Sequence, residues 1–217
     1  MNASRPFVVL LGGELRVTDR LRAKVGGWAA VAADGGMRHA AALGLTPEIW
    51  VGDFDSTSPE LVAAWPDVPR QPYPTGKNET DGELAVGEAL RRGASEIVLA
   101  GALGGPRSDH ATFHLLLACR LRAGGLPVLV TSGEEEATPL VTGEQRFDLP
   151  KGSLFSILGF SALSGIGIEG ARYPLAGYDL PLGGSRTISN IAETPLTVTL
   201  GAGTAVLIAR PYDLSGA

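Results

Sequence analysis

Residues 49–56 read Ile-Trp-Val-Gly-Asp-Phe-Asp-Ser, so a short apolar run passes directly into a glycine and two aspartates. Similar apolar runs recur as far as about Ser132, with helical segments between them. The runs that we predict as strands are Phe7–Leu11, Trp28–Ala33, Ile49–Val51, Ile97–Ala100 and Pro127–Thr131. This alternation is typical of a parallel sheet covered by helices. We therefore predict an α/β fold that begins with a three-layer parallel-sheet domain.

Helix boundaries are marked by capping residues in the same region. Ser58 precedes Pro59 and Glu60, so the serine can cap a helix whose first position the proline fills. The segment Thr80-Asp81-Gly82-Glu83 is a capping box, and its helix is predicted to end at Gly93. Gly44 is predicted to close a helix over Arg38–Leu43.

The pattern changes after Glu134-Glu135-Glu136, where β-type pieces replace helices. These pieces are Gln145–Leu149, Leu154–Leu158, Ile166–Glu169, Leu196–Leu200 and Thr204–Ala209. Glycine- and proline-bearing turns separate them, which favours an antiparallel β-sandwich or barrel-like domain. We place the boundary between about Ser132 and Pro139, giving domains over residues 1–134 and 138–217.

Charge and composition narrow the classes of partner. The 217 residues carry a formal net charge of −5, with acids and bases interspersed and no basic run. This argues against nucleic acid or an anionic membrane as the main partner and favours a small molecule. The apolar runs are too short for a signal-peptide core or a membrane span, so a cytoplasmic location is expected.

Polar residues follow the predicted strands where an open parallel sheet binds its ligands, beyond the carboxyl ends of the strands. Asp53 and Asp55 lie two residues apart, so on an extended segment they would point to the same side. The other segments expected at this edge are Gly12-Gly13, Asp34-Gly35-Gly36, Lys77-Asn78-Glu79-Thr80-Asp81 and Gly101–His110.

A group of carboxylates at one sheet edge needs a cation to offset the repulsion between their charges. Two carboxylates about 5 Å apart repel by roughly 3 kcal/mol at an effective dielectric near 20. Hard oxygen ligands favour Mg²⁺, which would also let a polyphosphate approach. Lys77 and Arg107 are the basic residues available to position it.

Each element also has a purely structural interpretation. Asp-Gly-Gly alone is more often a turn, and a capping box starts a helix wherever it occurs. His110 beside Asp109 could be a helix-start histidine bonded to a carboxylate, and Lys77 could be solvated. The recurrence of aspartates at several strand ends is what favours a site.

These residues resemble the thiamine pyrophosphokinase family. The matching segments follow the family's order and spacing, and with the β-rich end they cover nearly the whole chain. They are Asp34-Gly35-Gly36, Leu43–Glu48, Gly52-Asp53-Phe54-Asp55-Ser56, Lys77–Ala85, Gly101–Gly105 through Asp109-His110, and Ile188-Ser189-Asn190.

The resemblance implies a homodimeric enzyme with active sites between subunits. Its nucleotide- and Mg²⁺-binding domain would be residues 1–134, and its thiamine-binding domain residues 138–217. The implied reaction transfers the pyrophosphoryl group of ATP to the hydroxyl of thiamine, giving thiamine diphosphate and AMP.

The resemblance also implies roles for individual residues. Asp53, Asp55 and Asp81 would be catalytic and hold Mg²⁺, and Ser189 with Asn190 would contact thiamine. The nucleotide would lie against Gly12, Gly13, Asp34, Gly35, Gly36, Lys77, Thr80, Arg107, Asp109 and His110.

Two departures from the family pattern leave alternatives open. Pro106 is inserted before Arg107, and Ile191 and Ala192 follow Ser189-Asn190 where relatives often have an aromatic residue. The alternatives are a Mg²⁺-dependent nucleotide phosphotransferase or hydrolase with another acceptor, and a non-catalytic regulator that binds a nucleotide or thiamine.

Overall fold

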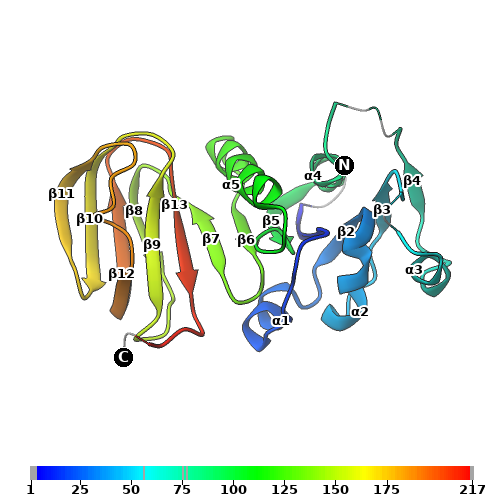
Figure 1. Ribbon diagram of the computed structural model, residues 1–217, viewed down its shortest axis with the longest axis horizontal. Coiled ribbons are helices and arrows are strands. Elements are labelled where there is room, and N and C mark those ends of the chain that lie inside the picture. The colour runs from blue at the N-terminus through cyan, green and yellow to red at the C-terminus, as the bar shows by residue number, and fades with distance from the viewer. Residues whose placement is uncertain (1–3, 56, 75, 77, 216–217) are drawn as a thin grey trace. The chain divides into compact units, whose positions relative to one another are not determined.

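The computed structural model describes residues 4–55, 57–74, 76 and 78–215 (Figure 1). The architecture is mixed α/β, with both parallel and antiparallel strands. The chain divides into two compact units. Unit 1 comprises Met1–His114 and Leu126–Gly133, and unit 2 comprises Leu115–Gly125 and Glu134–Ala217.

Unit 1 contains a parallel sheet with the strand order β6-β5-β1-β2-β3-β4. Its strands are β1 (Arg5–Leu10), β2 (Ala29–Ala33), β3 (Ile49–Gly52), β4 (Arg70–Pro72), β5 (Ala94–Ala100) and β6 (Val128–Thr131). The five predicted strands are confirmed. Strand β4 was not predicted because it is short and polar and contains Pro72, which an edge strand tolerates.

The helices are α1 (Asp19–Val25), the 3₁₀ turn η1 (Asp34–His39), α2 (Ala40–Leu43), α3 (Pro59–Ala64), α4 (Asp81–Arg91) and α5 (Ser108–Ala123). The predicted caps are confirmed: Ser58 accepts from Leu61 N, and Thr80 Oγ1 accepts from Glu83 N at 3.2 Å. Gly44, with φ of 67°, ends α2. The prediction of a helix over Arg38–Leu43 is wrong at its N-terminal end. Helix α2 begins at Ala40, and the residues before it, from Asp34 onward, form the 3₁₀ turn η1.

The core of unit 1 follows from the alternation of side chains along the strands. Val8, Leu10 and Trp50 belong to one buried cluster, to which α1 contributes Leu21 and α2 contributes Leu43. Helix α4 lies across β1, β2, β3 and β5. This packing fixes the N-terminus of α4 relative to the strand ends.

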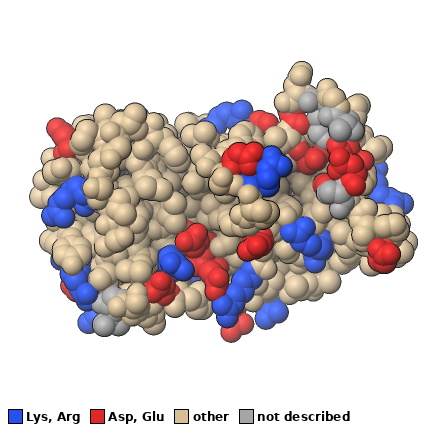
Figure 2. Space-filling view, viewed as in Figure 1, with Lys and Arg blue, Asp and Glu red and all other residues tan. Residues whose placement is uncertain are grey.

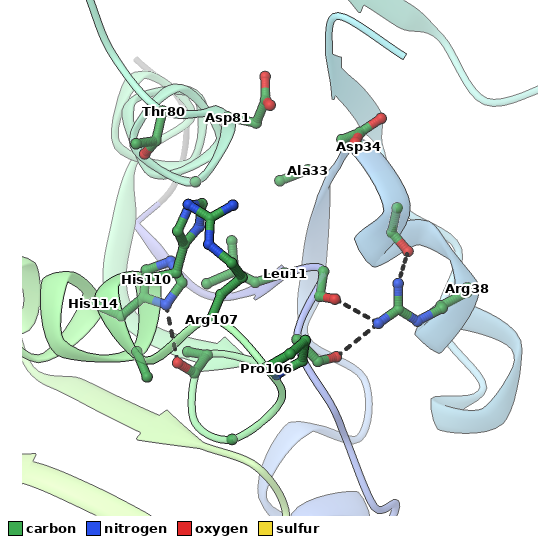
Figure 3. A pocket seen from close by; sticks show the side chains of 18 of the residues that line it. Leu11, Ala33, Asp34, Arg38, Thr80, Asp81, Pro106, Arg107, His110 and His114 are labelled. Atoms are coloured by element: carbon green, nitrogen blue, oxygen red, sulfur yellow. Dashed lines mark hydrogen bonds between the residues drawn. The ribbon is translucent and has the colours of Figure 1, made fainter. Parts of the chain in front are cut away.

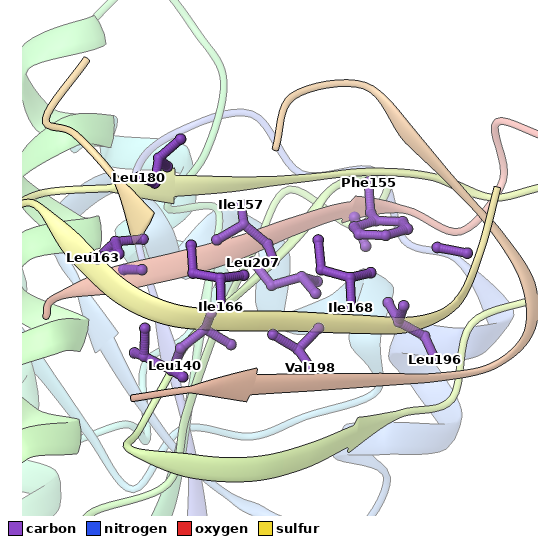
Figure 4. Close-up of a cluster of buried hydrophobic side chains, with 14 of the residues drawn as sticks. Leu140, Phe155, Ile157, Leu163, Ile166, Ile168, Leu180, Leu196, Val198 and Leu207 are labelled. Carbon is purple, nitrogen blue, oxygen red and sulfur yellow. The ribbon is translucent and has the colours of Figure 1, made fainter. Parts of the chain in front are cut away.

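Unit 2 contains β7 (Glu136–Pro139), β8 (Gly143–Phe147), β9 (Leu154–Gly159), β10 (Leu163–Ala171), β11 (Leu175–Leu180), β12 (Asn190–Leu200) and β13 (Ala205–Arg210). All recorded pairs among these strands are antiparallel. Strand β12 pairs with β9 near Asn190 and with β8 from Leu196 onward, so it joins two rows of strands. Figure 4 shows the buried cluster that these strands enclose, including Phe155, Ile168 and Leu207.

The predicted β pieces of unit 2 are confirmed, but β7, β11 and the first half of β12 were missed. Pro195 interrupts the apolar pattern of β12, and the pairing of β10 with β12 shifts register between Glu169 and Ala171. Strand β11 pairs only with β10 among the described strands and is mostly exposed, so little burial marks it in the sequence.

Acidic and basic side chains are interspersed over the face shown in Figure 2, as the mild net charge of −5 leads one to expect. No helix in the described part of the chain combines the length and the apolar character that crossing a bilayer requires.

Candidate active site

A pocket of about 500 Å³ lies in unit 1 at the carboxyl ends of its strands (Figure 3). Most of its wall comes from the segments that follow β1, β2, β3 and β5, and the N-terminal parts of α4 and α5 complete it. The predicted site residues that line it are Gly12, Gly13, Asp34, Gly35, Asp53, Thr80, Asp81, Arg107 and His110. Residues far apart in the chain therefore meet at one edge, as the topology predicts.

Three carboxylates converge at this pocket. Carboxylate oxygens of Asp34, Asp53 and Asp81 lie within 4.8 Å of one another, and all three residues are half-buried. Asp34 follows β2, Asp53 follows β3, and Asp81 begins α4. Like charges held this closely are a hard-oxygen donor set suited to a divalent cation.

Asp55 stands outside this group of three. The segment after Gly52 is not extended as expected, because Phe54 has φ of 63°. Asp55 is exposed, and its backbone N–H donates to Asp53 Oδ1 at 3.3 Å. The charge of Asp53 raises the pKa of Asp55, with further contributions from Asp34 and Asp81. Asp55 therefore lies in the electrostatic field of the group.

Magnesium should lower the pKa of Asp55. Neighbouring negative charges raise this pKa, so a nearby cation would stabilise the carboxylate and reverse the shift. A carbon-13 NMR titration of the side-chain carboxyl group, with and without Mg²⁺, measures the change. Potassium chloride at matched ionic strength controls for screening. An unchanged pKa at saturating Mg²⁺ would place Asp55 away from the ion.

Left-handed backbone conformations mark the acidic segments. Among the described residues other than glycine, positive φ occurs at Asp34 (39°), Phe54 (63°) and Ser189 (57°). Such conformations cost on the order of 1–3 kcal/mol each and persist where surrounding contacts impose them. Thr57 Oγ1 donates to Asp34 Oδ1 at 2.6 Å, which is one such contact.

Two glycines allow the strand-end segments to approach closely. A Cβ atom at Gly36 would lie 2.2 Å from the Leu10 carbonyl oxygen. At Gly101, whose φ is 75°, it would lie 2.5 Å from the Leu11 carbonyl oxygen. The Asp-Gly-Gly segment is thus more than a solvent-exposed turn, because its second glycine packs against β1.

Arg38 and His39 hold the Gly12-Gly13 segment, and neither was predicted. The Arg38 guanidinium donates to the carbonyl oxygens of Gly12, Gly13 and Gly35, and His39 Nε2 bonds Gly13 O at 2.9 Å. Burial lowers the pKa of His39. The sequence gives no sign of these contacts, because the partners are backbone carbonyl oxygens.

Arg107, which directly precedes α5, is paired with Asp109 in the first turn of that helix. Its Nε and Nη2 donate to the two carboxylate oxygens of Asp109 at 2.9 and 2.8 Å, and both side chains are largely exposed. This bonding holds the pKa of Asp109 well below its usual range. Arg107 lines the pocket, whereas Asp109 does not. Lys77, the other predicted cation, lies outside the described residues.

Comparison with known proteins finds a matching family model. Residues 27–130 match the family model described as "Thiamin pyrophosphokinase, catalytic domain". The resemblance to the thiamine pyrophosphokinase family is confirmed. No curated protein matches the chain significantly.

Solved structures support the same fold. A thiamine pyrophosphokinase from Bacillus subtilis is 21% identical, with a TM-score of 0.83 over 95% of this chain and 99% of that chain. One from Geobacillus thermodenitrificans is 26% identical, with a TM-score of 0.78 over 94% and 97%. A thiamin pyrophosphokinase family protein from Enterococcus faecalis is 24% identical, with a TM-score of 0.77 over 95% and 99%.

His114 is a second pocket histidine that the thiamine pyrophosphokinase resemblance did not point to. It is buried, and its Nδ1 lies 3.0 Å from the Ala102 carbonyl oxygen (Figure 3). A carbonyl only accepts, so Nδ1 carries the proton in this bond. Burial lowers the pKa of His114 and so favours the neutral ring. His110 lies one helical turn earlier and is exposed.

The residues that the thiamine pyrophosphokinase resemblance assigns to thiamine lie in unit 2. Asn190 is buried, and its side-chain amide makes two hydrogen bonds to the backbone of Tyr173. Asn190 Nδ2 donates to the Tyr173 carbonyl oxygen at 2.8 Å, and the Tyr173 backbone N–H donates to Asn190 Oδ1 at 3.0 Å. Its Oδ1 also accepts from Ile191 N. Ser189 N donates to Ser156 Oγ at 3.0 Å. Asn190 therefore has a structural role that was not anticipated.

Proposed function

We propose that the protein is a thiamine pyrophosphokinase that forms thiamine diphosphate and AMP from thiamine and ATP. The observation that carries this proposal is the convergence of Asp34, Asp53 and Asp81 on one pocket. The family match over residues 27–130 supports the class of enzyme.

The donor set fits a divalent cation. Three carboxylates from three elements place oxygens within 4.8 Å of one another, and Mg²⁺ prefers such ligands. Asp34, Asp53 and Asp81 would hold the ion, and the prediction that Asp55 is also a ligand stays a prediction. The bound ion would supply neutralisation of charge on the phosphate oxygens.

The residues of the chain would bind and orient the nucleotide. In the proposed reaction the thiamine hydroxyl oxygen bonds to the β-phosphorus, and the bond from that phosphorus to the bridging oxygen of AMP breaks. The hydroxyl proton leaves to solvent. A loose transition state needs little early deprotonation, so no general base is assigned. Arg107 uses two of its five N–H groups on Asp109, so its other N–H groups could donate to a phosphate.

The thiamine side of the proposal rests on the resemblance. Ser189 and Asn190 would contact thiamine in a homodimer whose active sites lie between subunits. The Asn190 amide retains one N–H beyond its bond to Tyr173 O, so a contact to a ligand would use that hydrogen. The cytoplasmic location stays a prediction from the sequence.

A product assay tests the proposed function. The protein is incubated with ATP, Mg²⁺ and thiamine, and the products are separated by chromatography. We expect thiamine diphosphate and AMP in equal amounts. ADP with modified thiamine would indicate transfer of a single phosphoryl group, and nucleotide cleavage with unchanged thiamine would indicate hydrolysis. Binding without any turnover would favour the non-catalytic regulator.

A further inference from the structure

Trp50 connects the core of unit 1 to the acidic edge of the sheet. It lies in β3, two residues before Gly52, and is completely buried in the cluster that contains Val8 and Leu10. A buried indole N–H needs an acceptor. Trp50 Nε1 donates to the backbone carbonyl oxygen of Asp34 at 2.8 Å. A core side chain is therefore bonded to the backbone of a site residue.

The same indole also contacts the second acidic segment. Its ring packs edge-on against Phe54, with centroids 5.3 Å apart and an interplanar angle of 74°. Phe54 stands between Asp53 and Asp55. One buried side chain thus touches Asp34 directly and Asp53 through its neighbour.

Asp34 and Phe54, the two residues of the acidic segments that Trp50 contacts, are both in left-handed backbone conformations. Asp34 has φ of 39° and Phe54 has φ of 63°, values that residues with a Cβ adopt only where contacts hold them. The segments are also adjacent, because a Cβ atom at Gly52 would lie 3.1 Å from Asp34 Cβ. Relaxation of either residue would redirect the carboxylate of Asp34 or Asp53.

We propose that Trp50 is a positioning residue of the metal site, which holds Asp34 and Phe54 so that the carboxylates of Asp34 and Asp53 meet that of Asp81. This inference rests on the proposed function for its metal ion. The indole N–H donates the hydrogen bond to Asp34 O, which an apolar residue of similar size could not do.

Metal binding without nucleotide tests the proposal. Trp50→Phe keeps an aromatic ring but removes the N–H donor, and Trp65→Phe is the matched control because Trp65 packs against the same cluster. Electron paramagnetic resonance with Mn²⁺ as the probe measures free and bound metal. Loss of one hydrogen bond corresponds to about a two- to tenfold rise in the Kd for Mn²⁺, which is the change expected for Trp50→Phe. Trp65→Phe should bind Mn²⁺ with the same Kd as the unsubstituted protein.

A second measurement uses the intact protein and so does not depend on whether Trp50→Phe folds. The chain has three tryptophans, so nitrogen-15 labelling gives three indole N–H resonances. We expect a Mg²⁺ titration to shift the Trp50 resonance more than those of Trp28 and Trp65. Spectra of Trp28→Phe and Trp65→Phe assign two of the peaks, and the third belongs to Trp50 by elimination.

The outcomes separate this inference from the function on which it rests. A parent protein that binds neither Mn²⁺ nor Mg²⁺ would overturn the proposed metal site, and this inference with it. Metal binding by the parent with an unmoved Trp50 resonance would overturn the inference alone. Equal weakening in Trp50→Phe and Trp65→Phe would do the same, because it would reflect general loosening of the core.

Discussion

Asp53→Asn and Asp81→Asn should each abolish turnover and leave the fold intact. Asparagine keeps the shape of the side chain but removes the charge that would bind the metal. Removal of one preorganised electrostatic group lowers kcat by about 10²–10³ in enzymes, and loss of the ion would lower it further. Because the three carboxylates repel one another, the thermal stability of either variant without metal should equal or exceed that of the unsubstituted protein.

Rates of thiamine diphosphate formation and thermal unfolding curves measure the two effects. Asp19→Asn is the control, because Asp19 is fully exposed at the start of α1. Near-normal activity in either test variant would remove that residue from the mechanism. A lowered melting temperature would instead give the carboxylate a structural role.

Gly101→Ala should destabilise the protein far more than Gly104→Ala. Both glycines have positive φ, 75° and 77°, so a Cβ strains the backbone at either position by about 1–2 kcal/mol. Only at Gly101 would that Cβ meet backbone, at 2.5 Å from Leu11 O, whereas nothing lies within 4 Å at Gly104. Overpacking adds about 1–3 kcal/mol.

Urea unfolding of both variants measures the difference. The free energy of unfolding should fall by about 2–5 kcal/mol for Gly101→Ala and by about 1–2 kcal/mol for Gly104→Ala. Equal losses would mean that β1 and the segment after β5 can separate without cost. The contact that fixes this wall of the pocket would then be unimportant.

The convergence of Asp34, Asp53 and Asp81 was predictable from sequence. Their segments follow predicted strands or a capping box, and parallel topology brings those ends to one edge. The predicted strands and the caps at Ser58 and Thr80 were confirmed for related reasons, since apolar runs and cap residues act locally.

The orientation of Asp55 could not be predicted in the same way. The argument that Asp53 and Asp55 share a side assumes an extended segment, and the left-handed Phe54 breaks that assumption. Phenylalanine is a residue that sequence rules place in strands, and its conformation here is accompanied by a tertiary contact, the packing against Trp50.

Arg38, His39 and His114 were missed because their partners are backbone carbonyls. A carbonyl oxygen has no identity in a sequence, so no pattern relates Arg38 to Gly12 or His114 to Ala102. Asn190 likewise bonds the backbone of Tyr173, a contact that depends on how β12 enters its sheet. Side chain to backbone contacts of this kind become visible only in the fold.

The three clustered aspartates belong to segments that are distant in the chain, at positions 34, 53 and 81. An unfolded chain cannot hold them together, so an ion that binds all three binds only the native state. At a free concentration one hundred times Kd, such an ion would raise the free energy of unfolding by about 2.7 kcal/mol. Metal occupancy and native population would therefore be thermodynamically linked, and the melting temperature would depend on the magnesium concentration of the medium.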